Sequence, residues 1–369
     1  MPGVTRMVQI AFAPAPPTVV DAIEEVVVEM SIEAASVFRL KLGIAQTDLG
    51  DWTVLQEDLF RPLVPVTVRV GVGDIPVPEA LINGYVSRAS VTYSDEPGSS
   101  SLEITGLDAT HLMSLQEKVM PWPNMPDAAI ATAIFGQYAI VPMVQPTAPS
   151  LVEPEGTTIQ RGTDLRFLRK LARRNGFDLY VQPEPITGLD QGFFRPRLPV
   201  GLPQAVLNVR MGGETNVSGF GIHYDMTQPT SVLAAELDTT TKSPQPALAP
   251  ASLQPPMGIE PALMRVLPPP IVRPADTGLM RTGDLQLLSQ GITDLSSYAL
   301  VASGEVGDGV GPLRPGGLVN VRGAGRVYNG TYFLTQVTHT ITDDGYTQRF
   351  EARRNAATMT GAELYVEIA

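Results

Sequence analysis

Residues 61–69 read RPLVPVTVR, and residues 314–322 read RPGGLVNVR. Each stretch begins with an Arg-Pro pair, continues into residues that favour β-strands and ends with an arginine at the same distance from the pair. An Asn-Gly pair follows each stretch, at residues 83–84 and 329–330, and this pair is a strong signal for a hairpin turn. We therefore predict that the chain carries one antiparallel β module twice.

Period-two alternation extends the β prediction toward the N-terminus. Apolar residues occupy every second position from Val26 to Ile32 and again from Phe38 to Ile44. The run from Val64 to Val72 alternates in the same way. Such alternation predicts sheets with one buried face and one polar face.

Composition limits the possible classes of protein. The chain has 369 residues, of which 43% are hydrophobic and 17% charged, so it is long and apolar enough for several folded domains. Its net charge of −12 argues against a general nucleic-acid-binding surface, which would be basic. The absence of cysteine excludes disulfides and thiolate metal sites. Polar residues and Pro142 interrupt the longest apolar stretch, residues 128–144, so we expect no membrane span.

No residue pattern points to catalysis or to a bound cofactor. Glu25, Glu29 and Glu33 share one strand face, which is typical of a solvated surface. There is no GxSxG nucleophile elbow, and Asp343-Asp344-Gly345 fits a hairpin turn better than a calcium loop. The spacing of metal ligands is absent from the three histidines, His111, His223 and His339. We therefore predict that the protein is not an enzyme and has no catalytic, metal-binding or cofactor-binding residues.

The middle of the chain changes to a helical period. Asp127 is placed to cap a helix that runs through Phe135. Thr163 is placed to cap a second helix, and Gly176 is placed to end it. The apolar stripe of this second helix is Leu165, Leu168, Leu171 and Ala172. A strand from Phe177 to Val181 follows, so a small α+β domain is predicted here.

Positive charge gathers on the second predicted helix, although the whole chain is acidic. Its basic residues are Arg166, Arg169, Lys170, Arg173 and Arg174. They form either a solvated helix face or a surface that docks onto an acidic neighbour or onto another copy of this chain. Arg173 and Arg174 also lie in the last turn, where cations suit the helix dipole.

A proline-rich stretch separates the middle of the chain from the second copy of the repeat. Residues 244–274 contain ten prolines, and proline donates no backbone hydrogen bond. We expect an extended connector or surface arm without a regular ladder. A third helix is predicted from Asp284 to Ala302, although Gly291 weakens it.

Residues 160–177 read QRGTDLRFLRKLARRNGF, which resembles a signature of phage tail hub proteins. This family includes the phage late control D proteins, the hub of T4-like baseplates and the hub part of type VI secretion spike proteins. Residues 83–86 and 102–108 resemble the end of the family's first barrel. Residues 313–346, with Asn329-Gly330 and Gly345-Tyr346, resemble its second barrel. The resemblance spans roughly residues 20–358.

The resemblance implies a mainly β fold with α+β insertions. Each chain would contain two antiparallel β-barrels similar to those of tail tube proteins, a small α+β domain and a Pro-rich, helical insertion. We expect the first barrel at residues 1–107, the α+β domain at 108–205, the second barrel at 206–236 and 310–358, the insertion at 237–309 and a C-terminal tail at 359–369.

The resemblance also implies a structural hub at the baseplate of a contractile tail or injection machine. Three copies would form a pseudo-sixfold ring that adapts a hexameric inner tube protein to a trimeric spike protein. We expect the Pro-rich stretch to pack outside this ring, against baseplate wedge proteins or sheath-side partners. We expect the hub in the virion tail baseplate or an assembled injection particle, after synthesis in the bacterial cytoplasm. We expect no specific nucleic-acid partner. DNA or protein cargo could pass through the lumen, where acidic residues would keep an anionic cargo from sticking.

Two other functions remain open. A secreted β-rich enzyme acting on polysaccharide or cell wall would need paired carboxylates about 5–10 Å apart in a cleft. A carbohydrate-binding module or adhesin would display exposed aromatic side chains on a flat face, but aromatic residues make up only 6% of the chain.

Overall fold

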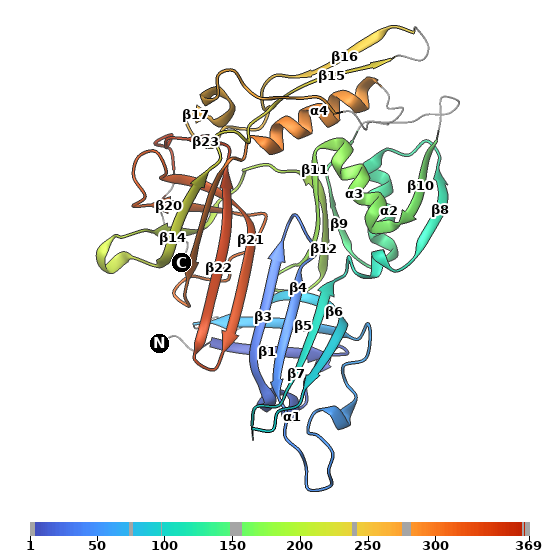
Figure 1. Ribbon diagram of the computed structural model, residues 1–369, viewed down its shortest axis with the longest axis vertical. Helices are drawn as coiled ribbons and strands as arrows, with labels where there is room; N and C mark the ends of the chain where they lie inside the picture. The colour runs from blue at the N-terminus through green and yellow to red at the C-terminus, as the bar shows by residue number, and fades with distance from the viewer. Residues whose placement is uncertain are drawn as a thin grey trace.

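The computed structural model describes residues 4–73, 77–96, 98–147, 157–237, 242–274, 282–363 and 365. Strands dominate these residues, and 13 of the described strands belong to one continuous sheet. The sheet forms two curled units, while the three longest helices and the smaller sheets lie together at one end of the molecule (Figure 1). The prediction of a mainly β fold with α+β insertions is confirmed.

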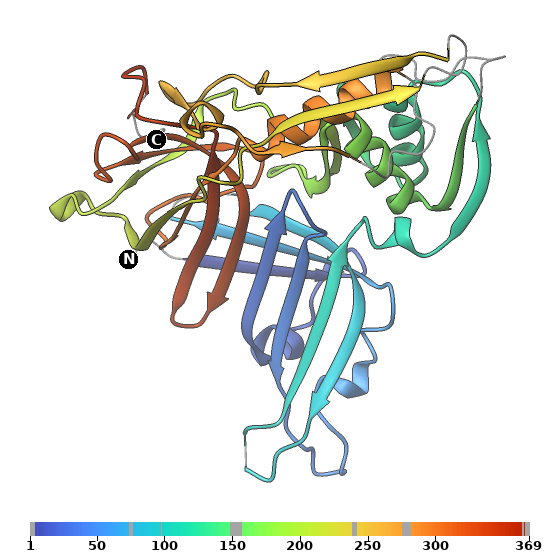
Figure 2. The same cartoon turned by 45° about the horizontal axis from the view of Figure 1, so that its top comes forward.

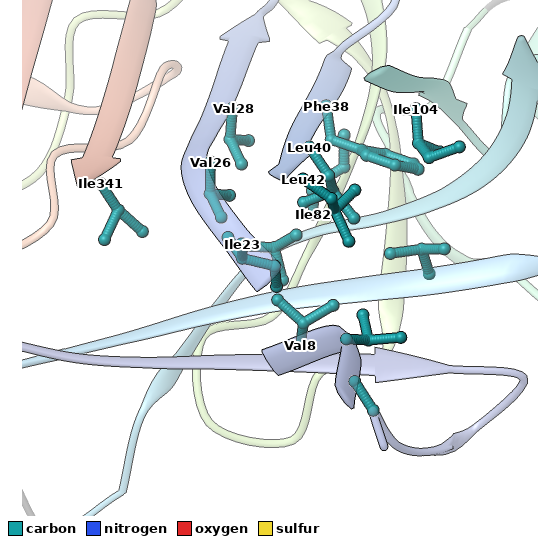
Figure 3. Close-up of a cluster of buried hydrophobic side chains, with 14 of the residues drawn as sticks. Val8, Ile23, Val26, Val28, Phe38, Leu40, Leu42, Ile82, Ile104 and Ile341 are labelled. Atoms are coloured by element: carbon teal, nitrogen blue, oxygen red, sulfur yellow. The ribbon is translucent and has the colours of Figure 1, made fainter. Parts of the chain in front are cut away.

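The first unit, which we call the N-unit, has its main strands in the order β3-β4-β7-β6-β5-β1, and all neighbours are antiparallel. The short strand β2 (Ala13–Pro14) and helix α1 (Pro17–Ala22) follow β1. Side chains from β1, β3, β4 and β7 point into a shared apolar core, which includes Val8, Val26 and Leu40 (Figure 3). The main strands are β1 (Val4–Ile10), β3 (Ile23–Ser31), β4 (Val37–Gly43), β5 (Pro65–Val72), β6 (Glu79–Thr92) and β7 (Ser101–Asp108).

The second unit, which we call the C-unit, has the strand order β14-β19-β22-β21-β20-β13. Its pairs are antiparallel except for β13, which is parallel to β20. A separate apolar core fills it, with Leu207, Tyr332 and Phe350 among its members. The strands are β13 (Pro203–Asn208), β14 (Val217–Tyr224), β19 (Leu300–Val306), β20 (Leu318–Arg322), β21 (Gly330–Thr342) and β22 (Gly345–Arg354).

In the sequence, a region of two helices and two small sheets comes between the two units. Strand β10 pairs with β8, and β9 joins β11 and β12 in the order β11-β12-β9. Both predicted helices are present and pack their apolar faces together, through Ile134 and Leu168 among others. The elements are β8 (Glu117–Trp122), α2 (Asp127–Gln137), β9 (Val141–Val144), β10 (Thr158–Thr163), α3 (Asp164–Asn175), β11 (Phe177–Pro183) and β12 (Asp190–Pro196).

The ends of α3 are as predicted, but the start of α2 is not. The Thr163 hydroxyl accepts the backbone N–H of Arg166, and Gly176 ends the helix with φ of 66°. Asp127 was expected to cap α2, yet Pro126 is the N-cap residue and no side chain caps this helix. The Asp127 carboxylate is drawn away because it accepts hydrogen bonds from Arg174 and Asn175 of α3.

The Pro-rich stretch forms strands, which corrects the expectation that it lacks a ladder. Strand β16 (Pro244–Ala249) pairs with β15 (Ser231–Leu237), and β18 (Ile271–Val272) pairs with the other edge of β15. Pro244 and Pro246 are two residues apart on an edge strand, so their missing N–H groups share the side away from β15. Leu248, on the same side, donates its N–H to Gln286 of a helix. A two-residue strand, β17 (Glu260–Pro261), pairs with β23 (Ala356–Ala357).

The third predicted helix is shorter than expected. Helix α4 (Thr282–Ser296) ends six residues before Ala302, and Leu300 begins strand β19 in the C-unit. Leu300, Ala302 and Val306 alternate with more exposed residues, so the strand period outweighs the helical one here. Strand β15, expected in the second barrel, instead belongs to the small sheet of the Pro-rich stretch. Residue 364 and residues 366–369 of the expected C-terminal tail lie outside the described residues.

The hairpin signals have different outcomes. Asp343 and Asp344 form the turn between β21 and β22, as predicted. Asn83 and Gly84 lie in the middle of β6, so the hairpin predicted there is wrong. Asn329 lies at the end of the longer loop between β20 and β21, where its side-chain oxygen accepts the N–H of Ala324. No described helix has the length and apolar character required to cross a membrane.

Candidate assembly interface

The two units repeat one strand frame. In sheet order, β3, β4, β7, β6 and β5 correspond to β14, β19, β22, β21 and β20. Strand β6 has a bulge at Ser87 against β7, and β21 has one at Thr335 against β22. If these bulges are superimposed, Pro65 of β5 corresponds to Leu318 of β20. The same offset relates the two Arg-Pro pairs in the sequence, so the prediction of a duplicated β module is confirmed.

One cross-strand hydrogen bond recurs with its residue types exchanged. Thr67 of β5 donates to Asn83 of β6 at 2.8 Å in the N-unit. In the C-unit, Thr331 of β21 donates to Asn320 of β20 at 2.7 Å, at the equivalent pair of positions. Asn83 also donates to Asp190 of β12, at 3.0 Å. This asparagine therefore anchors the N-unit to the middle region rather than forming a turn.

The two units are joined by a strand pairing between β3 and β21. The ladder runs from Gln336 opposite Ser31 to Thr342 opposite Glu25. Gln336 donates across it to the Glu29 carboxylate at 2.7 Å. The paired side chains Val28 and His339 are both fully buried. One chain thus builds a complete interface between two of its own units.

Charged and aromatic residues hold this junction in one arrangement. Arg314, the arginine of the second Arg-Pro pair, is largely buried and donates to Glu79 at 3.0 Å and to the Ala80 carbonyl at 2.8 Å, both in the N-unit. His339 lies 2.8 Å from the Tyr346 hydroxyl through Nδ1. Burial, together with nearby Arg314, lowers the pKa of His339 to about 3, so its ring is neutral.

Two strand edges have no described partner, although the equivalent edge in the other unit is paired. In β21, residues 336–342 pair with β22 on one side and with β3 on the other. The equivalent part of β6, Arg88–Thr92, pairs only with β7, and β14 pairs only with β19 among the described strands. These are the two equivalents of the β3–β21 junction, left unpaired at distant places in the chain (Figure 1).

The residues on these two edges match the buried residues of the junction by position. Val91 of β6 corresponds to His339, and Ile222 of β14 corresponds to Val28. Val91 and Ile222 are only partly buried, whereas their counterparts are fully buried. The next pair along the edges is Ala89 and Tyr224, which correspond to Val337 and Met30.

Solved structures share this architecture, although the sequence alone gives no match. No family model and no curated protein matches the chain. The tail protein from Neisseria meningitidis MC58 is 15% identical with a TM-score of 0.63, over 96% of this chain and 97% of that one. The 43 kDa tail protein of prophage MuSo2 from Shewanella oneidensis is 13% identical with a TM-score of 0.64, over 96% and 99%. The chain has the fold of these tail proteins.

A protein of a secretion system has a similar structure. The E. coli c3393 protein is a component of the type VI secretion system with structural similarity to the T4 bacteriophage tail proteins gp27 and gp5. It is 12% identical to this chain with a TM-score of 0.56, over 94% of this chain and 76% of that one. The shared architecture covers nearly the whole of this chain, including both units.

The segment that carried the family resemblance has a structural role within the tail-protein fold. Gln160 is fully buried and accepts the indole N–H of Trp122 at 3.1 Å. Asp164, four residues later, accepts hydrogen bonds from Lys118 and Tyr138. These contacts fix the start of α3 against β8 and α2. The segment therefore supports the start of the helix.

The basic face of α3 is divided between paired and unpaired residues. Arg174 binds Asp127 and lies 3.6 Å from Asp284, with its side chain only 14% exposed, so it is not part of a solvated face. Arg166 lies 3.9 Å from Glu117. The exposed remainder consists of Arg169, Lys170 and Arg173.

The described residues contain no group of three or more acidic or histidine residues arranged to hold a metal ion. Glu29 and Glu33, predicted on a solvated strand face, accept hydrogen bonds from Gln336 and Arg197. Burial raises the pKa of Asp190 to about 6, but this carboxylate is bound to Asn83 and supports the fold.

Proposed function

We propose that this protein is the structural hub of a contractile tail or of a related injection machine, and that three copies form a closed ring. The observation that carries this proposal is the β3–β21 junction. The chain joins its own two units by strand pairing and leaves the two equivalent edges without a described partner. Repeating the junction between copies pairs every such edge, and three chains supply six similar units around one axis.

The in-chain junction defines the register expected between copies. Strand β14 of one copy would run antiparallel to the second half of β6 of the next, with Ile222 opposite Val91 and Tyr224 opposite Ala89. The apolar side chains of both edges would then leave water, as their counterparts have done within the chain. An open strand edge is prone to pair with another chain, and a ring would pair the β6 and β14 edges of every copy.

The ring would adapt a hexameric inner tube protein on one side to a trimeric spike protein on the other. Six similar units match a sixfold tube approximately, while the differences between the two units keep the true symmetry threefold. The Pro-rich insertion belongs only to the C-unit and would face baseplate wedge proteins. The shared fold with tail proteins and a type VI secretion component supports a structural, non-enzymatic role in the tail baseplate or injection particle.

Cysteine cross-linking tests the ring, because the natural chain contains no cysteine. Val91→Cys and Ile222→Cys in one chain place two thiols on edges that face each other only between copies. Opposite residues in paired strands are close enough for a disulfide. Oxidation should give covalent dimers and trimers on a non-reducing gel, with nothing larger, because a closed ring of three has no further edge.

Ser90→Cys with Ile222→Cys is the matched control, because neighbouring residues of a strand point to opposite faces. This pair should cross-link poorly under the same conditions. Failure of the first pair to cross-link while the protein is trimeric would exclude this strand pairing. A monomeric or hexameric native mass for the unmodified protein would exclude the ring of three.

A further inference from the structure

A hollow of about 320 Å³ lies where α3 meets the junction of the two units. Its charged lining residues are Arg169, Arg173, Arg197, Arg353, Glu33 and Asp178. The other lining residues are apolar and include Phe177 and Leu295. Four cationic and two anionic side chains therefore surround one small space in a chain whose net charge is −12.

Both carboxylates of the hollow are already bound. Arg197, whose side chain is 4% exposed, donates to Asp178 from Nε at 3.1 Å and from Nη2 at 2.9 Å. Its Nη2 also donates to Glu33 at 3.0 Å, and Arg353 lies 3.6 Å from the other oxygen of Glu33. No acidic side chain of the hollow is left to neutralise Arg169 and Arg173.

Arg169 and Arg173 have no hydrogen-bond or ion-pair partner in the described part of the chain. They lie four residues apart on α3, so both reach the same hollow. Nη1 of Arg197 likewise donates to no described residue. Like charges one turn apart weaken a helix rather than stabilise it, and the partners of Arg166 and Arg174 show that α3 can neutralise its cations where needed.

We propose that this hollow binds the carboxylates of an acidic segment of a partner protein, with Arg169 and Arg173 as the binding residues. The planar guanidinium group matches a carboxylate through two parallel hydrogen bonds. The apolar walls restrict water and so strengthen such contacts. A short acidic peptide fits, whereas the remaining phosphates of a nucleic acid would meet an acidic protein. The site uses neither the β6 edge nor the β14 edge, so it does not depend on the proposed ring.

Fluorescence anisotropy with a labelled hexaglutamate peptide at low salt tests the proposal. The intact protein should bind the peptide, and the affinity should fall as salt rises. The R169Q/R173Q double variant should bind at least about tenfold more weakly, because each charge-assisted hydrogen bond corresponds to about a factor of ten. Unlabelled hexathymidylate should not displace the peptide.

The R166Q/K170Q double variant is the matched control, because it removes the same charge from the same helix outside the hollow. It should bind hexaglutamate as the intact protein does, and thermal unfolding checks that both variants fold. Equal weakening in the two variants, or displacement by hexathymidylate, would overturn the proposal. Loss of the native oligomer in R169Q/R173Q alone would also overturn it, because the occupant would then be a second copy of the chain.

Discussion

The N-unit and the C-unit share a strand frame but fill it with different side chains. In the N-unit the ring of Phe38, on β4, lies against Gly84 and Gly106, and a Cβ on either glycine would strike that ring. The equivalent positions in the C-unit are Ala302, Tyr332 and Ala352. The large aromatic residue comes from β4 in one unit and from β21 in the other. The two units share strand order and bulge position, but the large side chain that fills the equivalent part of the core comes from different strands.

The last strands of the two units end in opposite charges. Asp108 closes β7 and Arg354 closes β22, at equivalent positions, and both are buried. Asp108 accepts the backbone N–H of Ser36 at 2.7 Å and that of Thr110 at 2.9 Å. Arg354 donates to the backbone carbonyls of Met257, Asn329 and Thr358. The same position thus secures N–H groups in one unit and carbonyl groups in the other.

Arg354→Met should have the largest effect of the changes considered, because it leaves several buried carbonyl groups without a donor. We expect a loss of roughly 3–5 kcal/mol in the free energy of unfolding, measured by urea denaturation. Arg349→Met, on the exposed outer face of the same strand, should change it by less than about 0.5 kcal/mol. Similar losses in both variants would mean that the buried guanidinium does not secure the end of β22.

Gly106→Ala tests whether the ring of Phe38 requires a glycine at position 106. The added methyl group would strike Phe38 and the Tyr85 carbonyl, so we expect a loss of about 2–3 kcal/mol. Adding Phe38→Leu should recover part of that loss, and a double-mutant cycle measures the coupling. The reverse change in the C-unit, Ala352→Gly, should cost only about 1 kcal/mol. Absence of coupling would show that Phe38 is not what keeps position 106 a glycine.

His339 of the in-chain junction and Val91 of the free β6 edge occupy equivalent positions. His339→Val therefore places the same residue at both. Because the folded state holds the His339 pKa near 3, the unfolded chain binds more protons between about pH 3 and 6.5, and stability falls as pH falls through that window. The intact protein should lose about 1–2 kcal/mol from this residue between pH 6.5 and 5.

Urea titrations of the intact and His339→Val proteins at each pH measure this difference. The comparison is needed because Asp190, with a pKa raised to about 6, acts in the opposite direction. Between about pH 4 and 6 its carboxyl is more ionised in the unfolded chain than in the folded protein, so its contribution to stability rises as pH falls. As pH falls, the free energy of unfolding of the intact protein should decrease relative to that of the variant. A stability difference that does not vary with pH would show that His339 is not buried as a neutral ring.

Gly291→Ala addresses the insertion, which joins β14 to β19 in the C-unit where a short turn joins β3 to β4 in the N-unit. A Cβ at Gly291 would lie 2.5 Å from Cα of Gly176, where α4 crosses the end of α3. We expect a loss of about 1 kcal/mol in thermal or urea unfolding, although alanine normally favours a helix over glycine by about that amount. Gly283→Ala, in an open part of the same helix, should be neutral or stabilising. A stabilising Gly291→Ala would rule out close contact between the helices.

Local patterns predicted the duplicated module because the Arg-Pro pairs and the strands after them keep the same spacing. The Asn83-Gly84 turn failed because its signal is local, whereas pairing with β5 and the bond to Asp190 are long-range. Helix α4 was predicted too long because Leu300 continues its apolar pattern past its end, and only sheet partners identify Leu300 as a strand residue. Strand β16 was missed because proline excludes a central strand but not an edge.

The candidate interfaces differ in how visible they are in the sequence. The basic residues of α3 stand out in an acidic chain, but the sequence does not show that Arg174 is buried against Asp127 while Arg169 and Arg173 stay unpaired. The free edges leave no sequence signal, because Val91 and Ile222 are ordinary strand residues. They are recognised only because β3 pairs with β21 at the equivalent place within the chain.

The β3–β21 junction also bears on how quickly a ring could assemble. Because both strands belong to one chain, they meet at a high effective concentration, and their loss of translational freedom occurs during folding rather than during association. A ring of six separate units would require six contacts between molecules, whereas fused pairs require three. Fewer kinds of incomplete ring would therefore form during assembly, and each would be shorter-lived at a given protein concentration.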